Sequence, residues 1–156
     1  VEPDSNSREI LKFNIQKLLP DNGCITVHSC ALAQYAGDRL FHEGLNYASQ
    51  LSLTGQRRVN TSRIDDLGVA PSFIKLHLEG AELPTLKGAR KTLLTHRPII
   101  AATVCHNRDG LWQTPLWLME TLPEYKVLFR LHSWCGMNAV VFAIPNERGK
   151  RNSHES

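Results

Sequence analysis

The sequence predicts an α/β fold with an open, mostly parallel sheet and helices on both of its faces. Residues 73–78 (FIKLHL) follow a proline, precede a turn and lead into a helical pattern at 83–96, which gives a strand-loop-helix unit. Residues 99–104 (IIAATV) are a nearly continuous apolar run, which is typical of a parallel strand covered on both faces. Strands that alternate with helices in this way favour a parallel sheet with crossover connections.

The first part of the chain predicts a helix and then a strand. Apolar residues recur at helical spacing across 6–17, and Asn6 with Glu9 three positions later resembles a capping box. The segment PDNG at 20–23 ends this helix. Residues 24–32 then alternate in polarity and have a β-rich composition, which indicates a strand.

The rest of the chain predicts further strands and one more helix. In order, we expect short strands within an irregular loop at 37–58, a helix at 112–122, and strands at 125–131 and 139–144 with a short turn at 134–137 between them. The last two strands would form an antiparallel hairpin, so the sheet is mixed at its end. The polar residues 146–156 indicate a disordered tail, which leaves one domain over 1–145.

Composition excludes two classes of protein. The formal net charge is +3, and the basic residues are scattered except in the tail around Arg148, Lys150 and Arg151, which argues against binding to nucleic acid. No apolar run approaches the roughly 18 to 20 residues that a membrane-spanning helix needs, and the N-terminus has no signal-peptide layout. We therefore expect a protein without a membrane span. The sequence does not indicate an oligomeric state.

The cysteines predict a reducing compartment. Cys24, Cys30, Cys105 and Cys135 form no C-x-x-C pair, and their irregular spacing matches neither a zinc site nor a dense disulfide framework. We expect reduced, mostly buried thiols and a cytoplasmic protein.

A series of short motifs extends along nearly the whole chain, as far as Pro145. They are VEPD at 1–4, LxxNI at 11–15, AL at 31–32, IDDL at 64–67, FIKLHLEGAE at 73–82, LKGA at 86–89 and RPII at 97–100. In their order and spacing, these motifs resemble the FkbM-type methyltransferases. The resemblance implies a Rossmann-like methyltransferase fold, S-adenosylmethionine as the methyl donor, and a hydroxyl of a sugar, glycan or small metabolite as the acceptor.

In that fold the first strand is central and is followed by a glycine-rich loop that approaches the cofactor. This sequence contains neither, and it starts at Val1 without a methionine. We therefore expect an N-terminally truncated part of a longer enzyme. Alone, it should be inactive and bind S-adenosylmethionine poorly.

The resemblance also implies a set of cofactor-binding residues. Glu2 would lie at the end of the second strand, where a carboxylate can accept hydrogen bonds from both ribose hydroxyls. Cys30 and Ala31 would lie near the adenine edge, and His77 would also contact the cofactor. The alternatives are structural, because Glu2 could be an exposed terminal acid and a cysteine in a strand usually belongs to the core.

Candidate catalytic residues lie where two predicted strands end. His77, Glu79 and Glu82 place three ionisable groups within six residues, and such groups can take a proton from a substrate hydroxyl. The family pattern has Asp at the position of His77, so His77 either serves as a general base or marks a copy that has lost its chemistry. Glu79 and Glu82 could instead stabilise the helix dipole. His106 follows the next strand and would face the same crevice.

Two other functions remain open from the sequence. A degenerate, non-catalytic methyltransferase-like module could serve as an interaction or glycan-binding scaffold, and the residue at His77 is the main support for it. A metal-dependent hydrolase is disfavoured, because H-x-E-x-x-E at 77–82 does not match the H-E-x-x-H helix pattern. We therefore predict no metal ligands.

Overall fold

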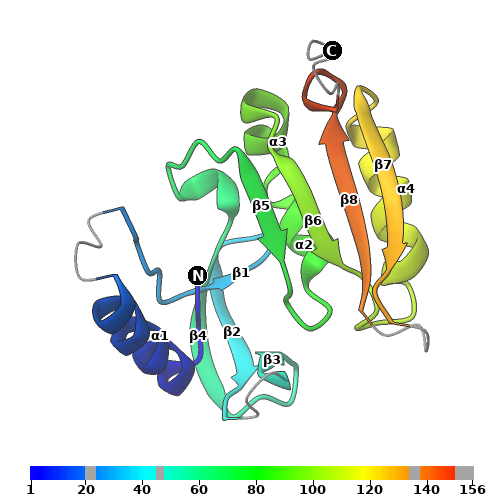
Figure 1. Cartoon of the computed structure of the whole chain (residues 1–156). Coiled ribbons are helices and arrows are strands. Elements are labelled where there is room, and N and C mark those ends of the chain that lie inside the picture. Colours follow the sequence, from blue (N-terminus) through cyan, green and yellow to red (C-terminus); the bar gives the residue numbers. More distant parts are fainter. Residues whose placement is uncertain (20–23, 45–47, 134–137, 150–156) are drawn as a thin grey trace.

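The structure is a computed structural model of the chain, and it describes residues 1–19, 24–44, 48–133 and 138–149. Figure 1 shows the arrangement of its elements. The predicted helix end at 20–23, the predicted turn at 134–137, Cys135 and residues 150–156 of the predicted tail lie outside the described residues.

The described strands form two four-stranded sheets (Figure 1). The first sheet has the order β1-β4-β2-β3, with β1 at Ala31–Leu32, β2 at Gly37–His42, β3 at Gln50–Leu51 and β4 at Arg57–Ser62. The second has the order β5-β6-β8-β7, with β5 at Phe73–Leu76, β6 at Ile99–Thr103, β7 at Tyr125–Leu131 and β8 at Ala139–Pro145.

Both sheets are mixed, so the prediction of a mostly parallel sheet is wrong. Only the pairs β1–β4 and β5–β6 are parallel among the described strands, and the other neighbouring pairs are antiparallel. Parallel pairing needs a long crossover connection. The chain provides one between β5 and β6, whereas shorter connections link β2 to β3 and β7 to β8. The predicted antiparallel hairpin at the end of the sheet is confirmed by the pairing of β7 with β8.

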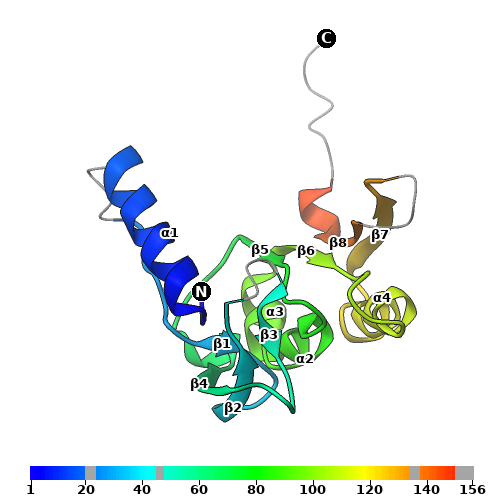
Figure 2. The ribbon, with the colours of Figure 1, turned by 90° about the horizontal axis from the view of Figure 1, so that it is seen from below.

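Among the described residues, α-helices cover one face of the second sheet, whereas helices on both faces were predicted. Figure 2 shows three helices on the same side of that sheet: α2 (Glu82–Lys87), α3 (Arg90–His96) and α4 (Gly110–Thr121). Ile74 and Leu76 point into this helical layer and are buried, whereas the neighbouring Phe73 is 53% exposed on the other face. The fourth helix, α1 (Ser5–Leu18), lies beyond the first sheet, away from β5 (Figure 1).

The helix expected at 83–96 is broken into α2 and α3. At the break, a side chain on Gly88 would place its Cβ 2.4 Å from the carbonyl oxygen of Ala33, which directly follows β1. Only glycine therefore allows the end of α2 to lie this close to the chain after β1. The first turn of α3 is stabilised by a residue outside the helix. The Asp65 carboxylate accepts hydrogen bonds from the backbone N–H groups of Lys91 and Thr92. Asp65 belongs to the short helix η2 (Ile64–Asp66).

The strand expected at 24–32 is shorter than predicted. Only Ala31 and Leu32 are in a strand, where they pair with Thr61 and Ser62 of β4. The preceding residues have β-rich composition but form no ladder, because composition alone cannot replace a hydrogen-bonding partner.

The helix α1 begins earlier than its predicted cap. Asp4 is the N-cap residue, and its carboxylate accepts a hydrogen bond from the Ser7 backbone at 2.9 Å. Asn6 and Glu9 lie inside the helix, so the capping box is wrong. A buried carboxylate at position 4 satisfies an N–H of the first turn and leaves Asn6 exposed.

The end of the described chain and its cysteines differ in detail from expectation. Residues Asn146–Arg148 form a short helix, η3, in which Glu147 pairs with Arg97 at 2.7 Å. Cys30 is buried, but Cys105 is half-buried and Cys24 is exposed, so the cysteines that the structure describes are not mostly buried. All three are free thiols. In the described part of the chain, no helix is both long and apolar enough to cross a membrane.

Candidate functional site

A cavity of about 810 Å³ lies between the N-terminal segment, the first sheet and the end of β5. Four of the predicted site residues line it, namely Glu2, Ala31, His77 and Glu79. They come from three separate segments of the chain. Cys30 is buried and does not line this cavity, so the structure brings Ala31 to it but not the Cys30 side chain.

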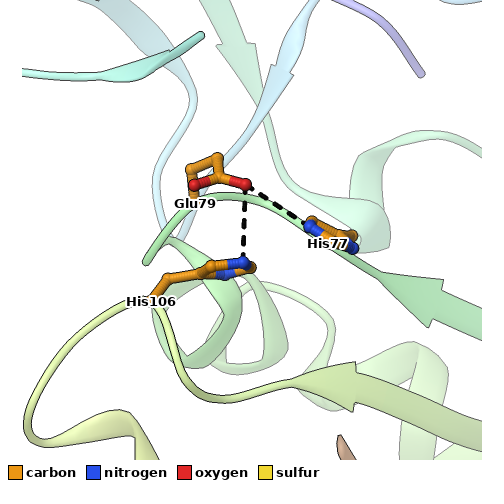
Figure 3. A group of neighbouring side chains, drawn as sticks. All are labelled: His77, Glu79 and His106. Atoms are coloured by element: carbon orange, nitrogen blue, oxygen red, sulfur yellow. Dashed lines mark ion pairs between the residues drawn. The ribbon is translucent and has the colours of Figure 1, made fainter. Parts of the chain in front are cut away.

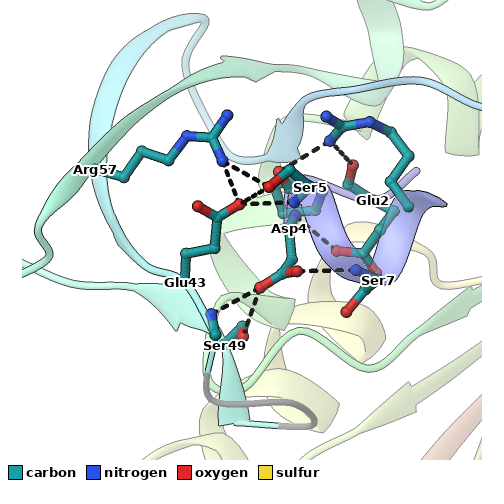
Figure 4. A network of polar contacts seen from close by, with 10 residues as sticks. Glu2, Asp4, Ser5, Ser7, Glu43, Ser49 and Arg57 are labelled. Atoms are coloured by element: carbon teal, nitrogen blue, oxygen red, sulfur yellow. Dashed lines mark hydrogen bonds and ion pairs between the residues drawn. The ribbon is translucent and has the colours of Figure 1, made fainter. Parts of the chain in front are cut away.

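Glu2 is fixed at the wall of this cavity by the start of α1. Its Oε1 accepts a hydrogen bond from the Asp4 backbone at 2.8 Å, and its own backbone N–H donates to the carbonyl oxygen of His28 at 3.0 Å. The Arg8 side chain donates to the carbonyl oxygens of Glu2 and Pro3 (Figure 4). The backbone on both sides of the carboxylate is therefore held in place.

A polar network attaches this segment to the first sheet (Figure 4). Glu43, just after β2, accepts hydrogen bonds from the backbone and hydroxyl of Ser5, both at 2.7 Å, and pairs with Arg57 of β4. The hydrogen bond from Arg57, with those from Ser5, lowers the pKa of Glu43 to about 2. Burial acts to raise the pKa of Asp4, but hydrogen bonds from Gly44, Ser7 and Ser49 outweigh it and lower that pKa.

His77, Glu79 and His106 form a cluster at the ends of β5 and β6 (Figure 3). One carboxylate oxygen of Glu79 lies 3.4 Å from Nε2 of His77 and 3.4 Å from Nε2 of His106. The two rings are 4.7 Å apart. Positive φ angles at Glu79 (50°) and Gly80 (103°) turn the chain sharply after the strand and direct the Glu79 side chain towards the two rings. The sequence-predicted catalytic residues therefore lie together.

Glu82 is buried next to this cluster and holds His106 and the turn after β5 in place. Its side chain is 4% exposed, and its Oε1 lies 2.8 Å from Nδ1 of His106. It also accepts hydrogen bonds from the backbone N–H groups of Leu78 and Gly80. A carboxylate that already accepts backbone hydrogen bonds requires His106 to donate from Nδ1, which leaves Nε2 facing Glu79. Glu82 is thus a positioning residue for His106 and for the turn after β5.

Asn107, in the polar loop that was expected to face the crevice together with His106, is a further positioning residue, a role that was not predicted. Its amide donates to the carbonyl oxygen of Gly80 at 3.1 Å and accepts from the backbone of Gly110 at 2.6 Å. It therefore joins the loops after β5 and β6. An asparagine three residues before a helix start is a recognisable turn and capping signal, and that signal could have identified it.

A second cavity of about 780 Å³ adjoins the cluster on its other side. Glu79 lines both cavities, and His106 and Asn107 line the second one. Its lining also includes Arg39 of β2 and Arg58 of β4. The cluster therefore lies at the junction of two spaces, each of which is large enough for a small molecule.

The family model for the methyltransferase FkbM domain matches residues 1–147. The chain belongs to the FkbM methyltransferase family. A crystal structure titled methyltransferase FkbM from Methylobacillus flagellatus KT matches this FkbM-family chain with a TM-score of 0.72 and 25% sequence identity. The match covers 91% of this chain and 35% of that one, so the chain spans about a third of the length of this FkbM relative. No curated protein matches the sequence.

Proposed function

We propose that this chain is part of an S-adenosylmethionine-dependent methyltransferase that methylates a hydroxyl of a sugar, glycan or small metabolite. One observation carries the proposal. The cavity between the two sheets has the Glu2 carboxylate on one wall and the cluster of His77 and Glu79 on another. A cofactor bound along the first wall would have its reacting end near the second. Membership of the FkbM methyltransferase family supports this reaction class.

The cofactor side of the cavity fits the chemistry of S-adenosylmethionine. When bound, this group supplies an electrophilic methyl group. Glu2 offers a half-buried carboxylate with fixed backbone, which suits a vicinal diol. Ala31 is small and leaves room beside the end of β1, and His77 lines the same space. Cys30 would contribute only through its backbone, since its side chain lies in the core.

The acceptor hydroxyl would approach the same cluster from the second cavity. Its oxygen gains the methyl group and must lose a proton. His106 is the best-oriented group to assist, because Glu82 fixes its ring and turns Nε2 towards the junction of the cavities. Glu79 and His77 complete the polar surface at this point. Arg39 and Arg58 also line the second cavity, and their guanidinium groups could donate hydrogen bonds to an acceptor that is rich in hydroxyl groups.

We further propose that a strand and a glycine-rich loop precede Val1 in a longer protein and complete a Rossmann-like sheet. Among the described residues, β5 pairs only with β6, so its other edge is free. A cavity of about 360 Å³ is lined by residues 73–76 of β5 and also by Val1. An extended segment placed there would cover the unpaired edge. The much longer FkbM relative is consistent with additional chain.

Isothermal titration calorimetry with S-adenosylmethionine tests both proposals. We expect the N-terminally extended protein to bind, and residues 1–156 alone to bind poorly and to be inactive. In the extended protein, Glu2→Ala should weaken binding about 10- to 100-fold, the effect of losing hydrogen bonds to a charged group. Glu9→Ala, an exposed acid on α1, is the matched control. Micromolar binding by residues 1–156 alone would refute the need for the added strand.

The non-catalytic module is the second candidate, and it rests on His77 at a position where the family pattern has Asp. A methyl-transfer assay of the extended protein with sugar and small-molecule hydroxyl acceptors separates the two functions. Methylated product supports the enzyme. Cofactor binding without product, with product restored by His77→Asp, supports the degenerate module.

We also propose a cytoplasmic location, because the three described cysteines are free. Labelling of these thiols in freshly lysed cells would test it. Extensive oxidation before lysis would contradict it.

A further inference from the structure

We propose that His77, Glu79 and His106 bind a divalent transition metal ion such as Zn²⁺. One potential ligand atom from each residue lies within 4.8 Å of those of the other two. Two imidazoles and one carboxylate are a donor set that suits zinc and its neighbours in the first transition series. The linear spacing at 77–82 concealed this set, because the third ligand comes from the loop after β6 (Figure 3).

The distances within the cluster fit a metal better than direct hydrogen bonds. Zinc bonds of about 2.0 to 2.2 Å in tetrahedral geometry separate the ligand atoms by about 3.3 to 3.6 Å. Glu79 Oε1 lies 3.4 Å from each histidine Nε2. Hydrogen bonds between nitrogen and oxygen are usually about 2.7 to 3.2 Å long. The nitrogen atoms of the two histidines, which lie within 4.8 Å of each other, would need to come closer, and His77 is 47% exposed and able to move.

The orientation of His106 provides the second argument. Because Nδ1 donates to Glu82, a neutral His106 directs the lone pair of Nε2 towards a carboxylate oxygen of Glu79. Two electron-pair donors then face each other, and a cation between them would bind both. In metal sites, the ring nitrogen of a histidine that does not bind the metal usually donates to a carboxylate or a carbonyl oxygen. Glu82, with a side chain 4% exposed, provides it here.

The position of the metal suggests its role, which rests on the proposed methyl transfer. Three protein ligands leave at least one coordination position open, and the cluster lies where the two cavities meet. An acceptor hydroxyl bound there would have a lowered pKa and could release its proton to water at neutral pH. If no metal binds, the proton would pass directly to Nε2 of His106.

Calorimetry with zinc chloride on the purified, chelator-treated protein tests the site. We expect one Zn²⁺ per chain, and a loss of affinity of more than about 100-fold in both His77→Ala and Glu79→Gln, since even second-shell changes cost 10- to 100-fold. His96→Ala is the matched control. His96 is exposed at the end of α3, before β6 begins, whereas the cluster lies after β6. His77 is half-exposed, so its removal should leave the fold intact, and circular dichroism would verify this.

Two results would overturn the metal site. One is the absence of zinc binding by the unmodified protein, and the other is equal zinc affinity in the unmodified, His77→Ala and Glu79→Gln proteins. Neither depends on cofactor binding. If methyl transfer continues in the presence of a chelator, the metal has no role in the reaction, but the proposed function stands. If the protein fails to bind S-adenosylmethionine, the proposed function is wrong, but the zinc site is unaffected.

Discussion

Glu82 is a buried side chain that holds the candidate site in shape without being one of the proposed reacting groups. Its two carboxylate oxygens accept from two backbone N–H groups of the turn after β5 and from His106. The turn contains Glu79 in a left-handed conformation, which is unusual for a residue with a side chain. The hydrogen bonds from Leu78 and Gly80 on either side of Glu79 stabilise that conformation.

We expect Glu82→Gln to lower the free energy of unfolding by about 1 to 3 kcal/mol, because a buried amide cannot accept all three hydrogen bonds. The NH₂ group of glutamine would face a backbone N–H, and both groups are donors. Urea unfolding would measure the change. Glu120→Gln, at an exposed position of α4, should stay within about 0.5 kcal/mol of the unmodified protein. Equal stability of the two variants would show that Glu82 does not hold the turn.

At the scale of elements, the start of α1 depends on a residue that the periodic pattern did not identify. Apolar spacing indicated the helix but could not identify its cap, because Asp4 and Asn6 are both good capping residues. The structure decides between them through tertiary contacts. The second carboxylate oxygen of Asp4 accepts hydrogen bonds from the Gly44 backbone and the Ser49 hydroxyl, which the local sequence does not contain.

A pair of substitutions distinguishes the two caps. Asp4→Ala removes the cap and leaves the Gly44 N–H without its acceptor, so we expect a loss of about 1 to 3 kcal/mol in the free energy of unfolding. Asn6→Ala should change it by less than about 0.5 kcal/mol, because Asn6 is exposed inside the helix. Thermal unfolding of both variants gives the comparison. A larger effect at Asn6 would restore the predicted capping box.

Strong local patterns predicted elements well, and weak local patterns did not. The apolar run of β6 and the hairpin strands β7 and β8 were correctly predicted. The break between α2 and α3 was not, because it arises from the close approach of Gly88 to Ala33. The direction of pairing was predicted for the hairpin of β7 and β8 but not for the antiparallel pairs of β2 with β3, β2 with β4 and β6 with β8. Pairing direction depends on the connections between strands and not on their composition.

At the scale of the whole molecule, the site combines segments that are distant in sequence. We predicted that His77, Glu79 and His106 lie close together, because ligands bind at the ends of parallel strands and these residues follow two neighbouring strands. The structure confirms that they lie close together. The same reasoning could not reveal that Glu82 and Asn107 hold them, because those contacts depend on the conformation of two loops. The attachment of α1 through Glu43 and Arg57 was equally hidden, because 38 residues separate Ser5 from Glu43.

This attachment should make stability depend on pH in an acidic range. The folded protein lowers the pKa of Glu43 from 4.5 to about 2. Its contribution to stability is therefore complete above pH 4.5 and is lost as the pH falls towards 2. We expect Glu43→Gln to be less stable than the unmodified protein at pH 7 and equally stable near pH 2. Urea unfolding at several pH values measures this, with Glu9→Gln, at an exposed position of α1, as the control. A stability difference that is independent of pH would contradict the assignment.

The bare backbone of Gly88 has an effect that reaches beyond its own neighbourhood. It lets the chain after β1 and the junction of α2 with α3 touch directly. The main cavity is lined by β1, which precedes the first of these segments, and by the turn at 77–81, which precedes α2. Gly88 itself does not line that cavity. A methyl group added at Gly88 would push these two segments apart. The width of the binding cavity should therefore change, although Gly88 does not line it.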